Sequence, residues 1–256
     1  DRHPKFACCS PCWGRPRSRD ISTESPSLPR TFSRCGTLCA MTEEAPAAPA
    51  LRNTREQRSW YWYDWANSAY VTTTATVLYS PYLSDVATRA ACNGSSDPCG
   101  RNLQILGMGV DPGSLFFYLV TISTLVSAVL LIYVGAIADR SHNPARLLAW
   151  TAWIGAGAAS AMFLVSGTNW QLGSLLLVIA SLCLGASMVI YDSLLCRIAT
   201  PDERDAVSSR GWALGYAGGG LLLALNLGLL LLGPKHLGMS TELVVRICLL
   251  SAGLWW

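Results

Sequence analysis

Charged residues are scarce in this sequence. Of its 256 residues only 14% are Asp, Glu, Lys or Arg, while 51% are hydrophobic. Soluble domains carry about 25% charged residues, and the charges here are clumped between long apolar runs. This excludes an ordinary soluble domain and predicts a protein whose solvent is a lipid bilayer. The net charge is only +3, and basic residues gather at the ends of apolar segments with no basic stripe interleaved with aromatics, so nucleic acid is not an expected partner.

Motifs of catalysis, metal binding and nucleotide binding are also missing. The three His residues are scattered, and none accompanies Cys or acids at the spacing of a metal site. The sequence has no Walker loop and no nucleophile elbow around a serine. The glycine-rich stretch at 155–160 is weakly similar to a dinucleotide-binding fingerprint, but it lies within an apolar segment. We therefore expect no catalytic residue, no metal, no cofactor and no ATP-driven transport by this chain alone.

The first 58 residues differ from the rest in composition. They are rich in Pro, Ser and Arg and have no apolar period, which predicts a disordered N-terminal tail over 1–58. The first Met is Met41, so Met41 is expected to be the native start and residues 1–40 to be upstream sequence.

Six apolar segments follow in residues 59–256, and a membrane helix needs about 20 mostly apolar residues. The first five are expected over Tyr63–Leu83, Ser114–Ala138, Leu147–Ser166, Leu172–Leu195 and Trp212–Leu232. The sixth is expected to begin near Leu243 and runs to Trp256. The sixth is too short to cross a bilayer, which predicts a sequence truncated inside a helix. The predicted fold class is all-α, a polytopic membrane helix bundle with six helices.

Lys and Arg are unequally divided between the two sets of loops. Eight of them fall beside the N-terminal tail and in loops 139–146 and 196–211, against four on the other side. By the positive-inside rule the N-terminus is cytoplasmic, and loops 84–113, 167–171 and 233–242 lie outside. Cys92 and Cys99 share the first of these outer loops. The sequence leaves two alternatives for this pair, a disulfide or two free thiols.

The first segment, WYWYDWANSAYVTTTATVLY, is unusually polar. On a helix Asp64, Asn67, Ser68 and Val71 share a face. The next turns add four hydroxyls, those of Thr72, Thr73, Thr74 and Thr76. An acid at the entrance of a membrane helix is costly and often functional. Asp64 therefore belongs to a substrate or proton pathway, or it is an interfacial acid that caps the helix and pairs with a neighbouring Arg. For the stripe from Asn67 to Thr76 we expect a cavity lining.

The fourth segment carries a second acid. Asp192 precedes Arg197 by a little over one helical turn. Asp192 is therefore either a proton site or one half of a structural ion pair with Arg197. Ser187 and Tyr191 are one turn apart and are expected to line the same face.

The loop GAIADRSHNPARLL after the second segment combines acidic and basic residues. Gly135 allows close helix approach, and Asp139, Arg140 and Arg146 follow it. We expect a gating ion-pair cluster that includes Asp192 at the same membrane edge; the alternative is an ordinary positive-inside loop.

The fifth segment is rich in glycine. Gly211, Gly215 and Gly219 are four residues apart, a spacing that lets membrane helices pack backbone to backbone. We expect helix packing here, with a hinge at 218–220 as an added hypothesis.

These motifs resemble a known family. Gly135, Asp139 and Arg140 resemble the loop signature of the major facilitator superfamily, although its second Gly is His142 here and its later basic pair is reduced to Arg146. WYWYDWANSAY at 60–70 and RGWALGYAGGGLLLALNL at 210–227 resemble the vacuole-effluxer family, the autophagy-related permeases. The resemblance covers about 59–256. It implies twelve helices in two halves, a substrate path lined by the first and fourth helices, and, from fungal members, amino-acid efflux.

The leading hypothesis is transport of a small-molecule solute by alternating access, with amino acids as one substrate class. Its expected partners are membrane lipids and a missing C-terminal six-helix half. The alternatives are an intramembrane enzyme that uses Asp64 and Asp192 as an acid pair, and a membrane scaffold without transport. A composition rich in Ala, Gly and Arg favours a bacterial plasma membrane, with a fungal vacuole as the alternative.

Overall fold

The computed structural model describes residues 53–97, 99–105 and 107–256, so most of the predicted tail and the proposed start at Met41 lie outside the described residues. Helix α1, Arg55–Tyr70, begins inside the range predicted as tail. The Thr54 hydroxyl accepts the N–H of Gln57 at 3.3 Å, and the Gln57 side chain accepts the N–H of Thr54 at 3.2 Å. This capping box starts the helix before its apolar residues begin. The predicted boundary at residue 58 is therefore wrong for 55–58, which are helical.

The first apolar segment forms one long helical run with a π-helical middle. α1 continues into the π-helix η1, Val71–Leu78, and then into α2, Tyr79–Ala91. Beyond α2 a disulfide joins Cys92 to Cys99. A small antiparallel hairpin of β1 (Leu103–Ile105) and β2 (Met108–Val110) follows, with Leu103 opposite Val110.

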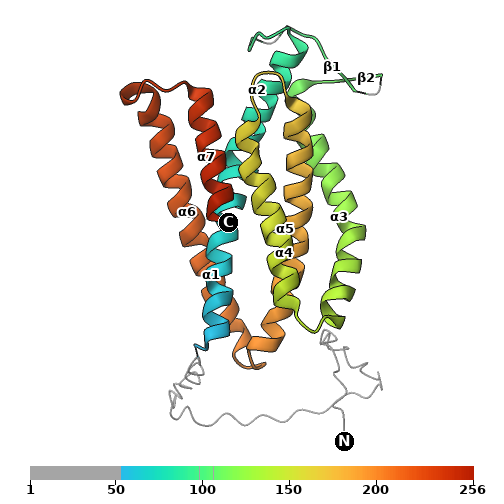
Figure 1. The fold of residues 1–256 in the computed structure, drawn as a ribbon, viewed down its shortest axis with the longest axis vertical. Coiled ribbons are helices and arrows are strands. Elements are labelled where there is room, and N and C mark those ends of the chain that lie inside the picture. The colour runs from blue at the N-terminus through green and yellow to red at the C-terminus, as the bar shows by residue number, and fades with distance from the viewer. Residues whose placement is uncertain (1–52, 98, 106) are drawn as a thin grey trace, which may run out of the picture. The chain divides into compact units, whose positions relative to one another are not determined.

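The remaining segments each form one helix. A single 3-10 turn, η2 (Pro112–Ser114), leads into the first of them. They are α3 (Leu115–Arg140), α4 (Pro144–Ala161) with its 3-10 extension η3 (Met162–Leu164), α5 (Trp170–Ile198), α6 (Arg204–His236) and α7 (Thr241–Trp255). The helices run back and forth between two ends (Figure 1). We call the end that carries the strands the hairpin end, and the end at which α1 begins the opposite end.

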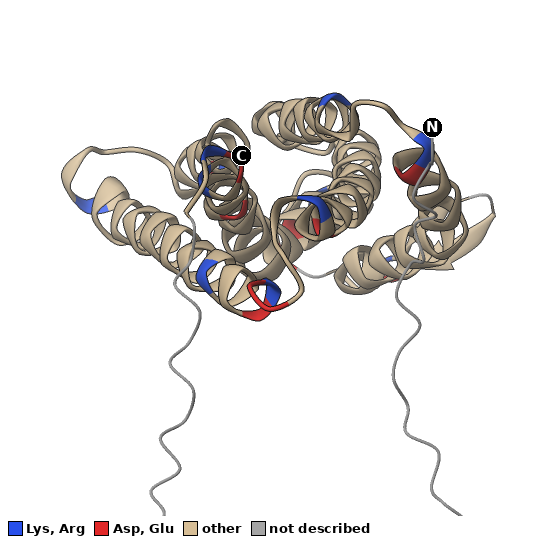
Figure 2. Ribbon diagram, turned by 90° about the horizontal axis from the view of Figure 1, so that it is seen from below, with Lys and Arg blue, Asp and Glu red and all other residues tan. Residues whose placement is uncertain are grey.

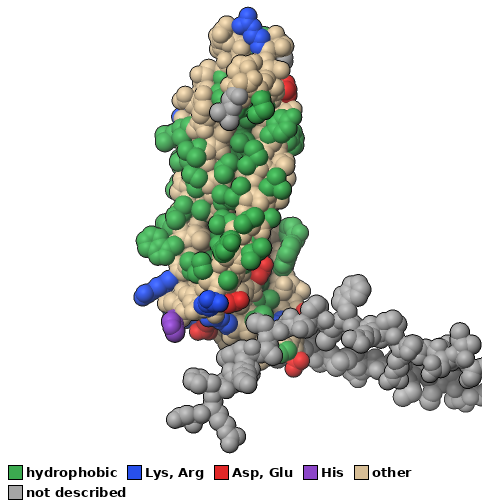
Figure 3. Space-filling view, turned by 90° about the vertical axis from the view of Figure 1, so that its right-hand side faces the viewer, with side chains coloured by type: hydrophobic (Ala, Val, Ile, Leu, Met, Phe, Trp, Pro, Cys, Tyr) green, Lys and Arg blue, Asp and Glu red, His purple; other side chains and the backbone are tan. Residues whose placement is uncertain are grey.

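The outer surfaces of these helices are apolar. Four helices of the described residues are long and apolar enough to cross a membrane, namely Pro112–Arg140, Pro144–Leu164, Trp170–Ile198 and Arg204–His236. Only 17% of the most apolar stretch of the first is buried, so its side chains require lipid or protein around them. Charged residues gather near helix ends and turns (Figure 2), and hydrophobic side chains cover the length between them (Figure 3). The predicted all-α polytopic bundle is confirmed.

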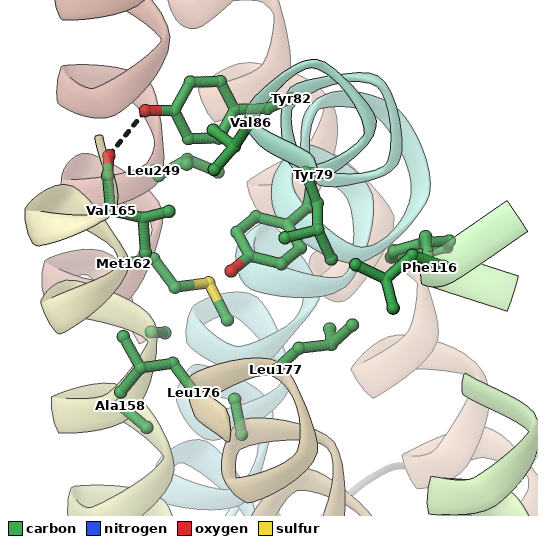
Figure 4. Close-up of a cluster of buried hydrophobic side chains, with 14 of the residues drawn as sticks. Tyr79, Tyr82, Val86, Phe116, Ala158, Met162, Val165, Leu176, Leu177 and Leu249 are labelled. Atoms are coloured by element: carbon green, nitrogen blue, oxygen red, sulfur yellow. Dashed lines mark hydrogen bonds between the residues drawn. The ribbon is translucent and has the colours of Figure 1, made fainter. Parts of the chain in front are cut away.

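The main core lies toward the hairpin end, where α2 meets α4, α5 and α7 (Figure 4). Tyr79 and Tyr82 place their rings in it, and both hydroxyls find backbone partners. The Tyr79 hydroxyl donates to the carbonyl of Gly173 at 2.8 Å, and that of Tyr82 to the carbonyl of Val165 at 2.5 Å. Buried tyrosines of this kind combine apolar area with a satisfied polar tip.

Charged side chains hold three elements together at the hairpin end. Arg89 of α2 forms ion pairs with Asp85 and, at 2.7 Å, with Glu242 of α7. The other Glu242 oxygen accepts the N–H of Gly167, before α5, at 3.3 Å. Partial burial acts in the opposite direction, but the contacts with Arg89 and Gly167 hold the pKa of Glu242 below its usual value. We call Asp85, Arg89, Glu242 and Gly167 the hairpin-end clamp.

Candidate functional site

A cavity of about 300 Å³ lies between α1, η1, α5 and α6, with a largely apolar wall that carries a few polar side chains. It contains most of the predicted pathway residues together with several aromatic and apolar ones. The residues that line it are Asp64, Asn67, Ser68, Val71, Thr72, Leu184, Met188, Tyr191, Asp192, Trp212, Gly215 and Tyr216. The predicted face of Asp64, Asn67, Ser68 and Val71 therefore borders one cavity, together with Thr72 and Tyr191.

Glycines of α6 allow α1 to approach closely beside this cavity. A Cβ added to Gly215 would lie 2.7 Å from both the Asp64 Oδ2 and the Ser68 Oγ, and one added to Gly219 would lie 2.8 Å from the Thr72 Oγ1. Gly211 lies against the Trp60 ring in the same way. The Thr72 hydroxyl reaches the Gly219 carbonyl at 3.2 Å. The glycine stripe thus brings the polar face of α1 against α6.

Asp64 is the most buried charged group of the cavity. Its exposed fraction is 8%, and among the described residues no Lys or Arg forms an ion pair with it. The described residues therefore do not form the alternative Asp64–Arg pair. The start of α1 is capped by Thr54 and not by Asp64. A carboxyl in this position is expensive inside a membrane protein, which is typical of functional sites.

Tyr191 of α5 borders the cavity and packs against α1. Its ring stacks on Trp60 with centroids 4.1 Å apart, and the Trp60 Nε1–H donates to the Tyr191 carbonyl at 3.0 Å. Only 3% of Tyr191 is exposed, yet its hydroxyl has no hydrogen-bond partner within the described chain. A buried hydroxyl without a partner is unusual, because its desolvation is uncompensated. Tyr191 is therefore rigidly held and has a free polar group.

Several predicted lining residues lie elsewhere. Ser187 is fully buried and donates to the carbonyl of Leu184 at 2.8 Å, so it does not border the cavity with Tyr191. Thr73 and Thr74 are fully buried, and Thr76 is exposed with its hydroxyl bonded to the carbonyl of Val71 at 2.8 Å. Consecutive residues of any helix point in different directions around its axis, so Thr73 and Thr74 cannot line the same wall as Thr72. Thr76 lies within the π-helix, where the four-residue spacing from Thr72 no longer returns to the same face.

The predicted gating cluster is not assembled in the described residues. Asp139, Arg140 and Arg146 are exposed, and no ion pair joins them to one another or to Asp192 within the described ranges. Gly135 is in ordinary contact with Val189, 3.7 Å from a Cβ built there, so it allows no special close approach. Asp192 instead borders the cavity with Asp64, and it forms no ion pair with Arg197 in that part of the chain.

Two aromatic residues of the cavity were not predicted from the sequence. Trp212 and Tyr216 of α6 border it, with ring centroids 5.9 Å apart. They stand four residues apart, next to the glycines of RGWALGY, and a helix places them on one face. That spacing was a usable signal, since the neighbouring glycines already identified the face toward α1.

The fold and this cavity define a polytopic α-helical membrane protein with a polar site between its helices. The sequence profile described as "Vacuole effluxer Atg22 like" matches residues 52–256. The chain belongs to this family. The family is one of transporters and not of enzymes, which confirms the prediction of a transporter family and removes the ground for an intramembrane enzyme.

Individual relatives agree with this membership. The chain is 24% identical to the uncharacterized MFS-type transporter YxiO of Bacillus subtilis over 207 residues, which are 80% of this chain and 45% of that protein. It is 28% identical to autophagy-related protein 22 of Gibberella zeae over 194 residues, 70% of this chain and 27% of that protein. The chain thus spans less than half the length of either relative. No solved structure matches it.

Proposed function

We propose that this chain is one six-helix unit of a secondary transporter that moves a small solute through the cavity between α1, α5 and α6. The observation that carries the proposal is Asp64, a carboxyl with an exposed fraction of 8% and no ion pair within the described residues, which borders a cavity between membrane helices. A scaffold has no use for such a costly arrangement. Amino acids are the first substrate class to test.

The open side of the cavity supports a second unit as partner. Trp212 and Tyr216 border the cavity while 59% and 68% of their surfaces are exposed, so the described helices leave one wall incomplete. We infer that a further six-helix unit, in the same or another polypeptide, completes the wall and rocks against this unit. The proposed setting is a bacterial plasma membrane with the N-terminus in the cytoplasm.

A labelling experiment tests alternating access without knowledge of the substrate. Ser68 borders the cavity, so we would introduce Ser68→Cys into the whole protein after replacing every cysteine except Cys92 and Cys99 by Ala. Sealed vesicles would then be treated with a membrane-impermeant maleimide from either side. A transporter that alternates exposes the introduced thiol to both sides in turn, and we expect labelling from both.

The matched control is Gly220→Cys in the same background, because Gly220 of α6 has nothing within 4 Å of its Cβ position and does not border the cavity. Its labelling is expected to be slow from both sides. Labelling of Ser68→Cys from one side only would contradict the proposal and favour a static scaffold or receptor.

A further inference from the structure

The cavity has an uneven charge balance. Its described lining includes two carboxyl side chains, Asp64 and Asp192, and no Lys, Arg or His. An anionic group of a solute would therefore meet like charge and find no cationic partner on this wall, which disfavours its placement beside Asp64 and Asp192. A cation would meet one deeply buried and one exposed carboxyl.

Two deeply buried polar residues border the cavity. Asp64 is more than nine-tenths buried and has no ion pair in the described chain. The Tyr191 hydroxyl, on a residue with an exposed fraction of 3%, has no hydrogen-bond partner there. Both residues border the cavity. An ammonium group offers three hydrogen-bond donors and one positive charge, which are what a carboxylate and a free hydroxyl oxygen require.

The rest of the wall suits the body of an organic cation. Tyr191, Trp212 and Tyr216 provide aromatic rings, and Met188 provides a polarizable thioether. A cation is attracted to the face of an aromatic ring, and the hydrocarbon part of a ligand packs on rings and sulfur. A volume of about 300 Å³ is in the range of small-molecule sites.

We propose that the cavity selects amine-bearing organic cations, with the ammonium group at Asp64 and the Tyr191 hydroxyl and the apolar body against Met188, Trp212 and Tyr216. This inference rests on the proposed function for its role in transport and names its substrate class. Asp192, exposed at the edge of the cavity, attracts the cation before it reaches Asp64.

The experiment compares two solutes of nearly the same shape. Phenethylamine is a cation at neutral pH, and 2-phenylethanol replaces its amine by a hydroxyl. Isothermal titration calorimetry on the purified whole protein in detergent would measure both. We expect phenethylamine to bind at least about tenfold more tightly than the alcohol, because only the amine forms the charged contact with Asp64.

Variants assign the binding to the cavity. Asp64→Asn is expected to remove the preference for the amine, and Trp212→Leu, at an exposed position that does not threaten folding, to weaken amine binding about threefold or more. Asp205→Asn is the matched control, since Asp205 is an exposed carboxyl of α6 outside the cavity; it should leave the affinity unchanged. If Asp64→Asn fails to fold, the loss of amine binding in Trp212→Leu decides.

Two outcomes overturn the proposal: equal binding of amine and alcohol, or a preference for the amine that survives Asp64→Asn and Trp212→Leu. Its failure is separable from that of the transport function. Charge-indifferent binding with two-sided labelling of Ser68→Cys leaves transport standing and removes the cation selectivity. Cation binding that depends on Asp64, with one-sided labelling, supports the site and removes the transport function.

Discussion

Two buried tyrosines of the first helical run differ in one hydrogen bond. Tyr70 and Tyr79 are both fully buried. The Tyr79 hydroxyl donates to the carbonyl of Gly173 at 2.8 Å, whereas the Tyr70 hydroxyl has no partner in the described chain and its ring stacks on Trp256 with centroids 5.0 Å apart. The same chemical group is therefore satisfied at one position and left unsatisfied nine residues earlier.

This difference predicts opposite effects of the same substitution. Tyr79→Phe should lower the free energy of unfolding by about 1 kcal/mol, because it deletes a buried hydrogen bond. Tyr70→Phe should be neutral or stabilising, since it removes a hydroxyl whose desolvation is uncompensated. Thermal unfolding of both variants in detergent, followed by circular dichroism, measures the difference. Equal destabilisation by the two would contradict the assigned hydrogen bond.

At the scale of elements, the pairing of α1 with α6 depends on where the glycines of α6 face. Gly215 and Gly220 are only five residues apart, but they face different surroundings. A Cβ on Gly215 would lie 2.7 Å from the Asp64 carboxylate, whereas a Cβ on Gly220 has nothing within 4 Å. One glycine is needed for contact and the other is not.

Alanine at these two positions should therefore act in opposite directions. Gly215→Ala is expected to lower the free energy of unfolding by about 1–3 kcal/mol, because α6 and the Asp64 side chain must move apart. Gly220→Ala should stabilise α6 by up to about 1 kcal/mol, since alanine restricts the unfolded chain without a clash. Unfolding midpoints in the same detergent test this. A Gly215→Ala protein as stable as the wild type would show that the helices are farther apart than described.

At the scale of the whole molecule, the hairpin-end clamp joins α2, α7 and the loop before α5 through Arg89 and Glu242. The contacts lower the pKa of Glu242 from its usual value of 4.5. A lowered pKa means that the folded state favours the carboxylate. Its contribution to stability is therefore complete above the usual pKa and is lost as the pH falls through the lower, folded-state pKa.

We expect Glu242→Gln to lower the unfolding temperature at neutral pH and to lose part of the acid sensitivity of the wild type below about pH 4.5. The two proteins should therefore converge as the medium is acidified. Asp97→Asn is the control, because Asp97 is exposed and forms no ion pair in the part of the chain that the structure describes. A difference between wild type and Glu242→Gln that stays constant from neutral to acid pH would contradict the assigned ion pair.

Much of the fold was predictable because it depends on local properties. Apolar runs of membrane length placed five helices, and the sixth begins near its expected position. Polar helix ends were misjudged. The start of α1 is a polar capping box that precedes the apolar run, α2 continues to Ala91 beyond the expected end at Leu83, and α6 begins at Arg204, ahead of the expected start at Trp212. A hydropathy pattern reports where a helix meets lipid, and it does not report a polar turn beyond the membrane edge.

The candidate site was predictable only in part, because it depends on angles around helix axes. The three-and-four spacing from Asp64 to Val71 placed those residues on one wall correctly. The expectation that the whole polar run to Thr76 lines the cavity failed, because consecutive residues such as Thr73 and Thr74 face away from Thr72 on any helix and the π-helix changes the angle per residue before Thr76. Trp212 and Tyr216 join the site from α6, and the pairing of α6 with α1 is a contact between segments far apart in the chain.

The sequence by itself determined the solvent, the helices and the family, since hydropathy, length and motif are properties of contiguous residues. Only the tertiary structure decided that Asp192 borders the same cavity as Asp64 rather than joining the loop of Asp139 and Arg140, and that Ser187 turns away. The physical reason is that a carboxyl near a helix end is equally compatible in sequence with several partners. Its surroundings are set by the rotation and packing of α1, α5 and α6 against one another.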